Sequence, residues 1–215
     1  MIDLHTHTIY SDGVLIPAEL ARRARVRGYT ALAFTDHVDF SNLEFVLERL
    51  RAACETLAAG FGMTLLPGVE LTHLPPALIG RGVEEARKLG AKIVVVHGES
   101  LVEPVAAGTN RAAIEARADI LAHPGLLSES EAGLAAANGV FLEITTRRGH
   151  ALGNGRVAAL ARACGAGLLL NNDAHAPGDL VTEEMAEKIV LGAGLQADEW
   201  LKMQENARHL VEERR

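Results

Sequence analysis

The sequence predicts an α/β barrel in which parallel strands alternate with helices. Two observations support this: a helical stretch, a glycine and a short apolar run recur along the chain, and seven strand candidates follow one another without a polar interruption. Alternating strands and helices imply a parallel sheet, and short apolar runs are typical of strands buried on both faces. Seven such units favour a closed or nearly closed barrel, and a doubly wound open sheet is the alternative.

The repeated unit is clearest in "RRARVRGYTALAF", "EEARKLGAKIVVV" and "ALARACGAGLLL". Its glycines suit the residue after a helix, where the backbone turns left-handed; they are Gly28, Gly90, Gly139 and Gly165. We expect strands at residues 2–6, 30–35, 63–70, 92–97, 119–122, 139–145 and 167–172. We expect helices at residues 17–27, 43–58, 79–89, 110–117, 129–137 and 154–164, the fifth of them with a capping box formed by Ser128 and Glu131.

The length and composition suit one globular domain of moderate size or two very small ones, and the seven repeated units favour one domain. The chain has 215 residues, of which 48% are hydrophobic and 23% charged, and we expect the barrel at about 1–180 with further helices at 182–213. The net charge of −7 argues against a broad nucleic-acid-binding surface. Without a signal sequence, a membrane-spanning apolar run or a CxxC pair, we expect a cytoplasmic protein with free thiols at Cys54 and Cys164. Its oligomeric state is open.

Candidate metal ligands or catalytic groups stand at the end of every expected strand. They are His5 and His7, Asp36 and His37, Glu70, His97, His123, Glu143, and Asp173 and His175. Parallel strands end at one face of a barrel, where the active sites of α/β barrels lie, so these side chains are expected to converge. Taken singly, His73, His150 and His209 are read as ordinary loop or surface residues. The full set predicts a metal site.

Six segments of the chain resemble the PHP family, the polymerase and histidinol phosphatase superfamily. They are "DLHTHTIYSDG", "FTDH", "PGVE", "VVHGE", "AHPG" and "NNDAH", which run in the family's order between residues 3 and 175. The resemblance implies a distorted (β/α)7 barrel, a TIM-like fold that agrees with the seven units above. It also implies a centre of two or three metal ions and the hydrolysis of phosphate esters.

The resemblance implies nine ligand positions, all of which are filled in this chain. His5, His7, Glu70 and Asp173 match the first metal site of the family. Glu70, His97 and His123 match the second, with Glu70 bridging, and Asp12, His37 and His175 match the third. The alternative for Asp12 is an ordinary turn with Gly13. Ligands without thiolate suit Zn²⁺, Mn²⁺ or Fe²⁺, and the sequence does not choose among them.

Arginines after the sixth strand are candidates for phosphate binding. Arg147 and Arg148 stand there, and a guanidinium fork matches a phosphate dianion; the alternative is a solvated surface pair. Arg111 opens a helix whose N-terminal amides favour anions, and the alternative is that Thr109 or Asn110 simply caps that helix.

Two further residues complete the candidate site. His150 is a candidate for protonating a leaving group, and Asp36 is a candidate for orienting its neighbour His37, with an ordinary strand-end hydrogen bond as the alternative. The candidate catalytic residues are thus Glu70, Asp173, Asp36, Arg147 and Arg148, and the candidate substrate-binding residues are Arg147, Arg148, Arg111 and His150.

The predicted function is a metal-dependent phosphatase that acts on the phosphate monoester of a small metabolite, histidinol-phosphate-like or nucleotide-like. Attack on phosphorus by a hydroxide that bridges two ions is the expected reaction. The alternative is a phosphodiesterase or nuclease that acts on nucleotides or nucleic acid ends, although the negative charge makes nucleic acid an unexpected partner. A non-catalytic binding subunit is the third hypothesis, and the filled ligand positions argue against it.

Overall fold

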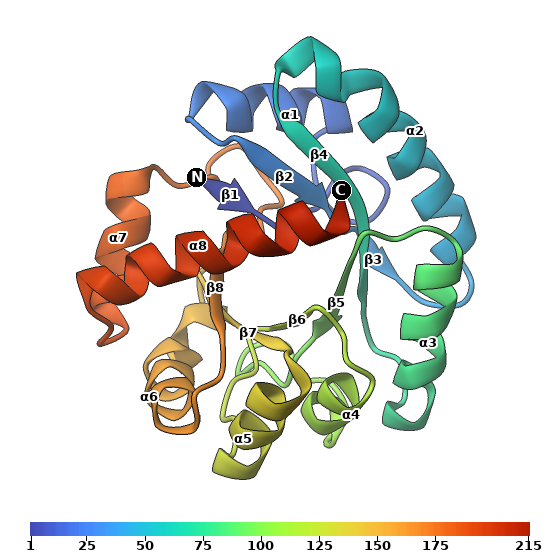
Figure 1. Ribbon diagram of the computed structural model, residues 1–215. Coiled ribbons are helices and arrows are strands. Elements are labelled where there is room, and N and C mark those ends of the chain that lie inside the picture. Colours follow the sequence, from blue (N-terminus) through green and yellow to red (C-terminus); the bar gives the residue numbers. More distant parts are fainter.

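A computed structural model describes residues 1–215 as a nearly closed barrel of parallel strands with helices on its outside (Figure 1). The strands are β1 (Ile2–Asp3), β2 (Ala31–Phe34), β3 (His37–Val38), β4 (Thr64–Leu71), β5 (Ile93–His97), β6 (Ile120–Ala122), β7 (Phe141–Thr145) and β8 (Leu168–Asn171). Their order around the barrel is β1-β2-β4-β5-β6-β7-β8, with β3 paired to β4. The predicted α/β barrel is confirmed.

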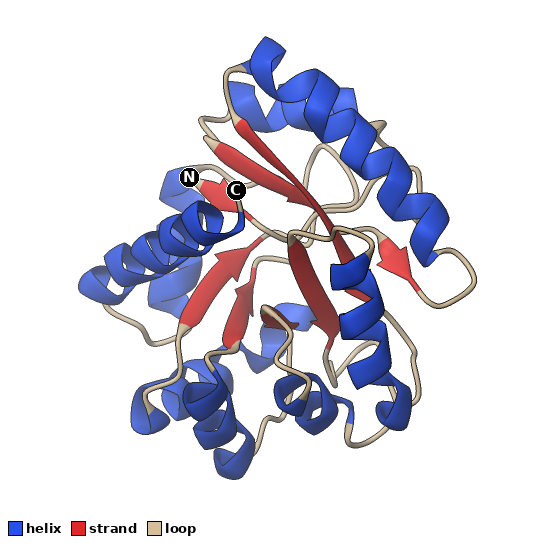
Figure 2. Ribbon diagram, turned by 45° about the vertical axis from the view of Figure 1, so that its right-hand side comes forward, coloured by secondary structure: helices blue, strands red, loops and turns tan.

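The helices follow the strands in alternation and cover the barrel from outside (Figure 2). They are α1 (Pro17–Val26), α2 (Leu43–Phe61), α3 (Pro76–Lys88), α4 (Thr109–Glu115), α5 (Glu129–Asn138), α6 (Asn154–Cys164), α7 (Glu183–Gly192) and α8 (Ala197–Arg214), with a short 3-10 helix at His150–Gly153. The four expected glycines all have positive φ, between 70° and 99°. The capping box of Ser128 and Glu131 begins α5 as expected.

The first and last strands meet at a seam that is held mostly by side chains. Between them the only ladder contact is an isolated bridge from Thr6 to Ala174. Lower in the seam, the Asn171 amide oxygen accepts from the Leu4 N–H at 2.9 Å, and Asp3 accepts from the side chain of Asn172 at 2.6 Å. We expected the first strand to run to residue 6, but its ladder stops at Asp3. Beyond Asp3 the chain is held by side chains on both sides, because the Leu4 N–H donates to the Asn171 amide and the Thr6 N–H donates to the Thr35 hydroxyl.

Two apolar cores hold the barrel together. The larger core lies between the strands and the surrounding helices, and the smaller core fills the barrel interior. Ala207, Leu210 and Val211 of α8 belong to the interior core together with Leu4 and Ile93 of the barrel. Helix α8 therefore closes the end of the barrel at which the strands begin, and it crosses the barrel in Figure 1. None of the helices has the length and apolar character that a membrane span requires.

One helix differs from the expectation in how it begins. Helix α4 starts at Thr109, but neither Thr109 nor Asn110 caps it. Instead, the Glu99 carboxylate accepts hydrogen bonds from the N–H groups of Gly108 and Asn110, both at 3.0 Å. A carboxylate is favourable at this end of a helix because the exposed amides there carry partial positive charge. The expected side-chain cap was wrong, and the cap comes from the loop after β5.

Candidate metal centre

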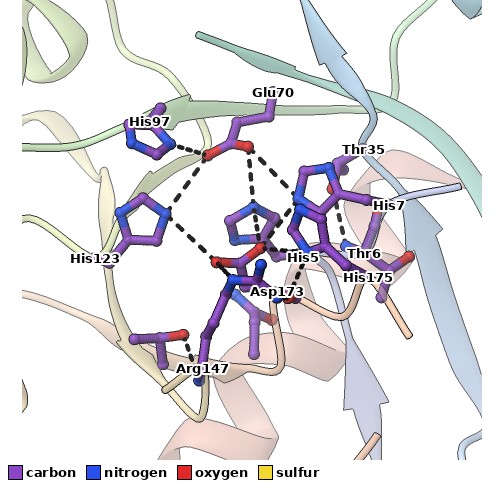
Figure 3. A network of polar contacts seen from close by, with 12 residues as sticks. His5, Thr6, His7, Thr35, Glu70, His97, His123, Arg147, Asp173 and His175 are labelled. Atoms are coloured by element: carbon purple, nitrogen blue, oxygen red, sulfur yellow. Dashed lines mark hydrogen bonds and ion pairs between the residues drawn. The ribbon is translucent and has the colours of Figure 1, made fainter. Parts of the chain in front are cut away.

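The polar side chains predicted at the strand ends converge on one face of the barrel (Figure 3). Four overlapping groups of side chains have ligand atoms within 4.8 Å of one another. They are His7, Asp12, His37 and His175; His5, His123 and Asp173; His5, His7 and Glu70; and His37, Glu70 and His97. All nine predicted ligand positions are present in this set. Their convergence follows from the parallel barrel, in which every strand ends at the same mouth.

Glu70 lies at the centre of the cluster. Its carboxylate is fully buried and lies within 4.0 Å of a ring nitrogen from each of five histidines. One oxygen, Oε2, faces His5, His7 and His37 at 3.3, 3.5 and 2.8 Å, whereas Oε1 faces His97 and His123 at 3.3 and 3.7 Å. The two oxygens thus divide the histidines into two groups, which is the arrangement that a bridging carboxylate requires.

Asp173 forms the second carboxylate of the cluster. Its Oδ1 lies 3.2 Å from His7 Nε2 and 3.4 Å from His175 Nδ1, and its Oδ2 lies 3.7 Å from His123 Nε2. Asp12 is more exposed and reaches the edge of the cluster from the loop after β1. Its Oδ1 lies 3.1 Å from His175 Nε2 and 3.5 Å from His37 Nε2.

The backbone takes unusual conformations at two of these side chains. Only four residues other than glycine have positive φ, and among them are His123 at 27° and Asp173 at 51°. Such conformations are costly for residues with a Cβ, and they concentrate at functional sites. At the ends of β6 and β8 they turn the two side chains back over the mouth of the barrel.

The buried atoms of the cluster lack partners. Ring nitrogens of His5, His7, His97 and His123, and both oxygens of Glu70, are buried without a hydrogen bond, although they approach one another closely. Leaving buried polar atoms unpaired costs free energy, so native structures rarely contain so many. Divalent metal ions would satisfy these lone pairs, and imidazole and carboxylate donors without thiolate suit Zn²⁺, Mn²⁺ or Fe²⁺. The residues present therefore fit a metal centre.

Burial sets the protonation of the histidines at the centre. Burial lowers the pKa of His7 and of His123 well below the usual value, and neighbouring histidines lower it further. Burial alone would raise the pKa of Glu70, but His5 and His37 outweigh it and hold that pKa well below its usual value. Near neutral pH this leaves His7 and His123 neutral beside an ionised Glu70, the states in which such groups bind metals. The carboxylates of Glu143 and Glu70 instead raise the pKa of His5 well above its usual value, and Glu70 raises the pKa of His37 to about 9.

Glu143 is a functional candidate that the ligand assignment from sequence left out. Its Oε2 lies 2.8 Å from His5 Nδ1 and accepts from the Asn171 side chain at 3.0 Å, while its Oε1 accepts from the His123 N–H at 3.2 Å. The carboxylate is fully buried. A carboxylate on one ring nitrogen orients the other nitrogen toward a metal. Its position at the end of β7 was a signal, but its partners could not be read from the sequence.

Asp36 is held away from the cluster. Its oxygens accept hydrogen bonds from the Thr8 N–H, the Thr8 hydroxyl and the Ser11 hydroxyl at 2.7–2.9 Å. It thereby fixes the loop after β1 that carries Asp12. The ring of neighbouring His37 has other partners instead, since its Nδ1 lies 2.7 Å from the Thr72 hydroxyl and 2.8 Å from Glu70 Oε2.

The arginine candidates differ in where the structure places them. Arg147 lies at the cluster, with Nη1 donating to the Asp173 carbonyl at 3.2 Å and Nε 3.5 Å from Asp173 Oδ2. Arg148 is exposed and forms no ion pair. Arg111 is also exposed, and its Nε donates to Glu115 at 2.8 Å along α4. The structure therefore brings Arg147, but neither of the other two, into contact with the metal-ligand candidates.

Two histidines that were read as ordinary lie beside the cluster. His150 is buried, its ring centre lies 4.2 Å from that of His123, and burial lowers its pKa to about 4. His73 stacks 6.0 Å from His97 and has a positive φ of 57°. His209, in contrast, is exposed on α8. His150 was also a substrate-binding candidate from the sequence, whereas no local signal marked His73, whose placement depends on contacts between distant loops.

Comparison with known proteins agrees with these observations. The PHP domain family matches residues 3–95, which carry five of the nine ligand candidates. An uncharacterized protein of Methanocaldococcus jannaschii is 51% identical over 195 residues, covering 90% of this chain and 89% of that protein. The DNA polymerase/3'-5' exonuclease PolX of Bacillus subtilis is 28% identical over 80% of this chain, which spans 34% of that protein.

Solved structures share the fold at low sequence identity. A chain of archaeal ribonuclease P with mature tRNA superposes with a TM-score of 0.73 at 17% identity, covering 100% of this chain and 91% of that chain. A metal-dependent tyrosine phosphatase, from work on YwqE of Bacillus subtilis and CpsB of Streptococcus pneumoniae, gives a TM-score of 0.64 at 16% identity, covering 99% and 94%. The matched domain and the 51% identical relative show that the chain belongs to the PHP domain family.

Proposed function

We propose that the protein hydrolyses the phosphate monoester of a small metabolite with the help of two or three divalent transition-metal ions. The observation that supports this most strongly is the set of buried, unpartnered nitrogen and oxygen atoms around Glu70. In this proposal the first ion is held by His5, His7, Glu70 and Asp173, the second by Glu70, His97 and His123, and the third by Asp12, His37 and His175. Ions bound there would activate water and neutralise the charge of a phosphate group.

The remaining residues would hold and orient these groups. Glu143 fixes the ring of His5 and the backbone of His123. Arg147 is partly exposed at the cluster, so its guanidinium is placed to bind a phosphate oxygen as well as Asp173. Arg148 and Arg111 have no such contact with the cluster, so we assign phosphate binding to Arg147. Zn²⁺, Mn²⁺ and Fe²⁺ all remain candidates.

The first experiment measures phosphate release from 4-nitrophenyl phosphate by protein stripped with a chelator and then loaded with Mn²⁺, Zn²⁺ or Fe²⁺. We expect activity only after metal is restored, and we expect the His5→Ala variant to lose it. A protein that binds none of these metals and gains no activity from any of them would overturn the proposal. A panel of metabolite phosphate esters, scored by the same phosphate release, would then identify the substrate.

The second candidate function is a nuclease that removes nucleotides from nucleic acid ends. Sequence relatives support it, because PolX of Bacillus subtilis is named as an exonuclease and 5'-3' exoribonucleases are 37% identical over 70 residues of this chain. The net charge of −7 opposes it. Hydrolysis of bis(4-nitrophenyl) phosphate or of a labelled oligonucleotide in preference to the monoester would favour the nuclease over the phosphatase.

A non-catalytic binding role is the remaining alternative, and the likeness to a chain of archaeal ribonuclease P is the observation that bears on it. The full set of ligand candidates argues for catalysis instead. Binding of metal without hydrolysis of any monoester or diester would support the binding role.

A further inference from the structure

A cavity of about 690 Å³ lies at the end of the barrel opposite the histidine cluster. Thr64 and Lys92, where β4 and β5 begin, line it, whereas Glu70 and His97 stand at the other ends of the same strands. Small-molecule sites have volumes of roughly 300–1,000 Å³, so the cavity has the size of a ligand site. It is separate from the candidate metal centre.

The cavity reaches an unpaired edge of the sheet. Strand β4 pairs with β2 from Thr64 to Pro67, but its ladder with β5 begins only at Gly68 and Ile93. On the side that faces β5, the hydrogen bond nearest the start of β4 runs from the Lys92 N–H to the Pro67 carbonyl at 2.8 Å. Between this bond and the start of β4, the side of the strand around Leu65 that faces away from β2 has no neighbouring strand. An edge of this kind presents backbone N–H and C=O groups that a ligand can bind.

The floor of the cavity is apolar. Cys54, Met63, Leu65 and Leu66 line it and are each buried. Leu65 belongs to the core outside the strands, whereas Leu66 belongs to the core inside the barrel. A cavity that contacts both therefore lies against the edge of the strand, with α2 and the last residue of α3 on its walls.

The rim of the cavity is cationic, although the chain as a whole is acidic with a net charge of −7. Arg51, Lys88, Lys92 and Arg215 line it, and Glu55 is the one acidic side chain among the lining residues. Lys88 pairs with Glu84 on α3, but the other three cations form no ion pair with a carboxylate. Arg51 and Arg215 are held in place by a carbonyl and a hydroxyl, those of Leu89 and Thr64.

We propose that this cavity binds a small organic anion with an apolar body, the acidic group lying between Arg51 and Lys92 and the body against Met63 and Leu65. Cations fixed by neutral partners keep their charge available for an anion, and the buried floor gains from covering an apolar group. Because the site lies at the far end of the barrel, its occupation does not depend on the metal-ligand candidates.

The probe for this site is 8-anilinonaphthalene-1-sulfonate, which joins an aromatic body to a single sulfonate. We expect a saturable rise in its fluorescence with one site per chain, the same in chelator and in Zn²⁺. The Arg51→Gln and Lys92→Gln variants should each weaken binding by about fivefold, the upper range for an exposed ion pair. Ala58→Trp, which fills a cavity wall, should abolish it.

The matched control is Arg49→Gln on the same helix, since Arg49 lies over the ring of Phe45 at 3.9 Å and does not line the cavity. This control should bind the probe as the parent does. Thermal melting of each variant checks that it is folded. If Arg51→Gln is unstable, the Lys92→Gln and Ala58→Trp variants still test whether the cavity binds the probe. The proposal would be overturned if the fluorescence did not saturate, or if the folded cavity variants bound the probe as tightly as the parent does. An equal loss of probe binding in the Arg49→Gln control would overturn it as well.

Discussion

Glu143 shows how a residue that is no ligand candidate can control several that are. The carboxylate contacts His5, the backbone of His123 and Asn171, which belong to three different segments of the barrel mouth. Because the His5 Nδ1 nitrogen is engaged, the Nε2 nitrogen is left to face Glu70 at 3.3 Å. One buried carboxylate thus fixes both the ring orientation and the spacing of the cluster.

We predict that Glu143→Gln weakens metal binding by about 10–100-fold, the usual effect of losing a partner behind a metal ligand. The amide cannot supply the negative charge that holds the His5 ring in place. Competition against a chromophoric chelator measures this affinity. The control is Glu115→Gln, which removes only a surface contact with Arg111. Equal metal affinity in the Glu143→Gln variant and the parent would contradict the role of Glu143.

The two cysteines should differ in reactivity. Burial raises the pKa of the Cys54 thiol to about 12, whereas Cys164 is partly accessible. Since the thiolate is the reacting form, a thiol reagent at pH 8 should modify Cys164 and leave Cys54 intact. Mass spectrometry of the intact protein should show one label per chain, and none after Cys164→Ser. Two labels on the folded parent would show that α2 does not protect Cys54.

At the scale of single residues, the sequence predicted which side chains would gather but not how they would be held. The spacing of His5, Glu70 and Asp173 relative to the strands was sufficient to predict that they share a mouth. The left-handed backbone at His123 and Asp173 carries no glycine signal, because it is imposed by tertiary contacts. Glu143 and His5 are 138 positions apart in the sequence, so no local sequence pattern could predict their contact.

Helix α8 is the element on which the closed end of the barrel depends. Its inner face places Leu210 among the interior residues, whereas Leu201 on the same helix is 68% exposed. The helix contacts both β1 and β8, so it also supports the seam from below. The sequence predicted helices in this region, but it did not predict that one of them would close the barrel.

We predict that Leu210→Ala lowers the free energy of unfolding by about 2–4 kcal/mol, because it removes buried methyl groups and leaves a cavity. Leu201→Ala should change it by about 0.5 kcal/mol or less, as expected for a surface position. Urea unfolding followed by circular dichroism measures both. Similar losses in the two variants would mean that α8 does not present this face to the barrel.

The start of α5 offers a test of a feature that the sequence did predict. Ser128 accepts from the Glu131 N–H, and the Glu131 side chain accepts from the Ser128 N–H at 2.8 Å. Ser128→Ala should cost about 1 kcal/mol of unfolding free energy, the typical value of a helix cap. Glu129→Gln, one residue on, serves as the control, because Glu129 is exposed and its side chain forms no hydrogen bond. Equal stability of Ser128→Ala and the parent in urea would show that the box contributes nothing.

Elements were predictable where their signals were local. Helices that end in a glycine and strands that are short and apolar appeared within a few residues of their expected bounds. The short strand β3 was missed because two residues are too few to show a strand pattern, and its partner β4 lies more than 30 residues away in the sequence. The cap of α4 was missed because Glu99 comes from another loop.

Metal ions that bind at the cluster should stabilise the whole molecule. The unpartnered atoms around Glu70 are a cost that bound ions remove, and ions that bind only the folded state stabilise it by mass action. At an ion concentration one hundred times the Kd, this amounts to about 2.7 kcal/mol. For a protein of this length we therefore expect the Tm to fall by about 5–10 °C in chelator.

Differential scanning calorimetry measures this shift. His5→Ala should abolish it, whereas His209→Ala, which changes an exposed histidine on α8, should leave it unchanged. A parent Tm that is the same in chelator and in Zn²⁺, Mn²⁺ or Fe²⁺ would contradict the linkage between metal and fold.

The seam between β1 and β8 has a consequence for the order of events during synthesis. His5 and His7 are synthesised more than 160 residues before Asp173 and His175, and the bridge from Thr6 to Ala174 joins the two segments. A nascent chain that has not yet been synthesised to residue 175 therefore has an unclosed barrel and an incomplete set of ligand candidates. If the cluster binds metal as proposed, the full set of ions could bind only to chains whose last strand has docked, so ion uptake would report on completed folding.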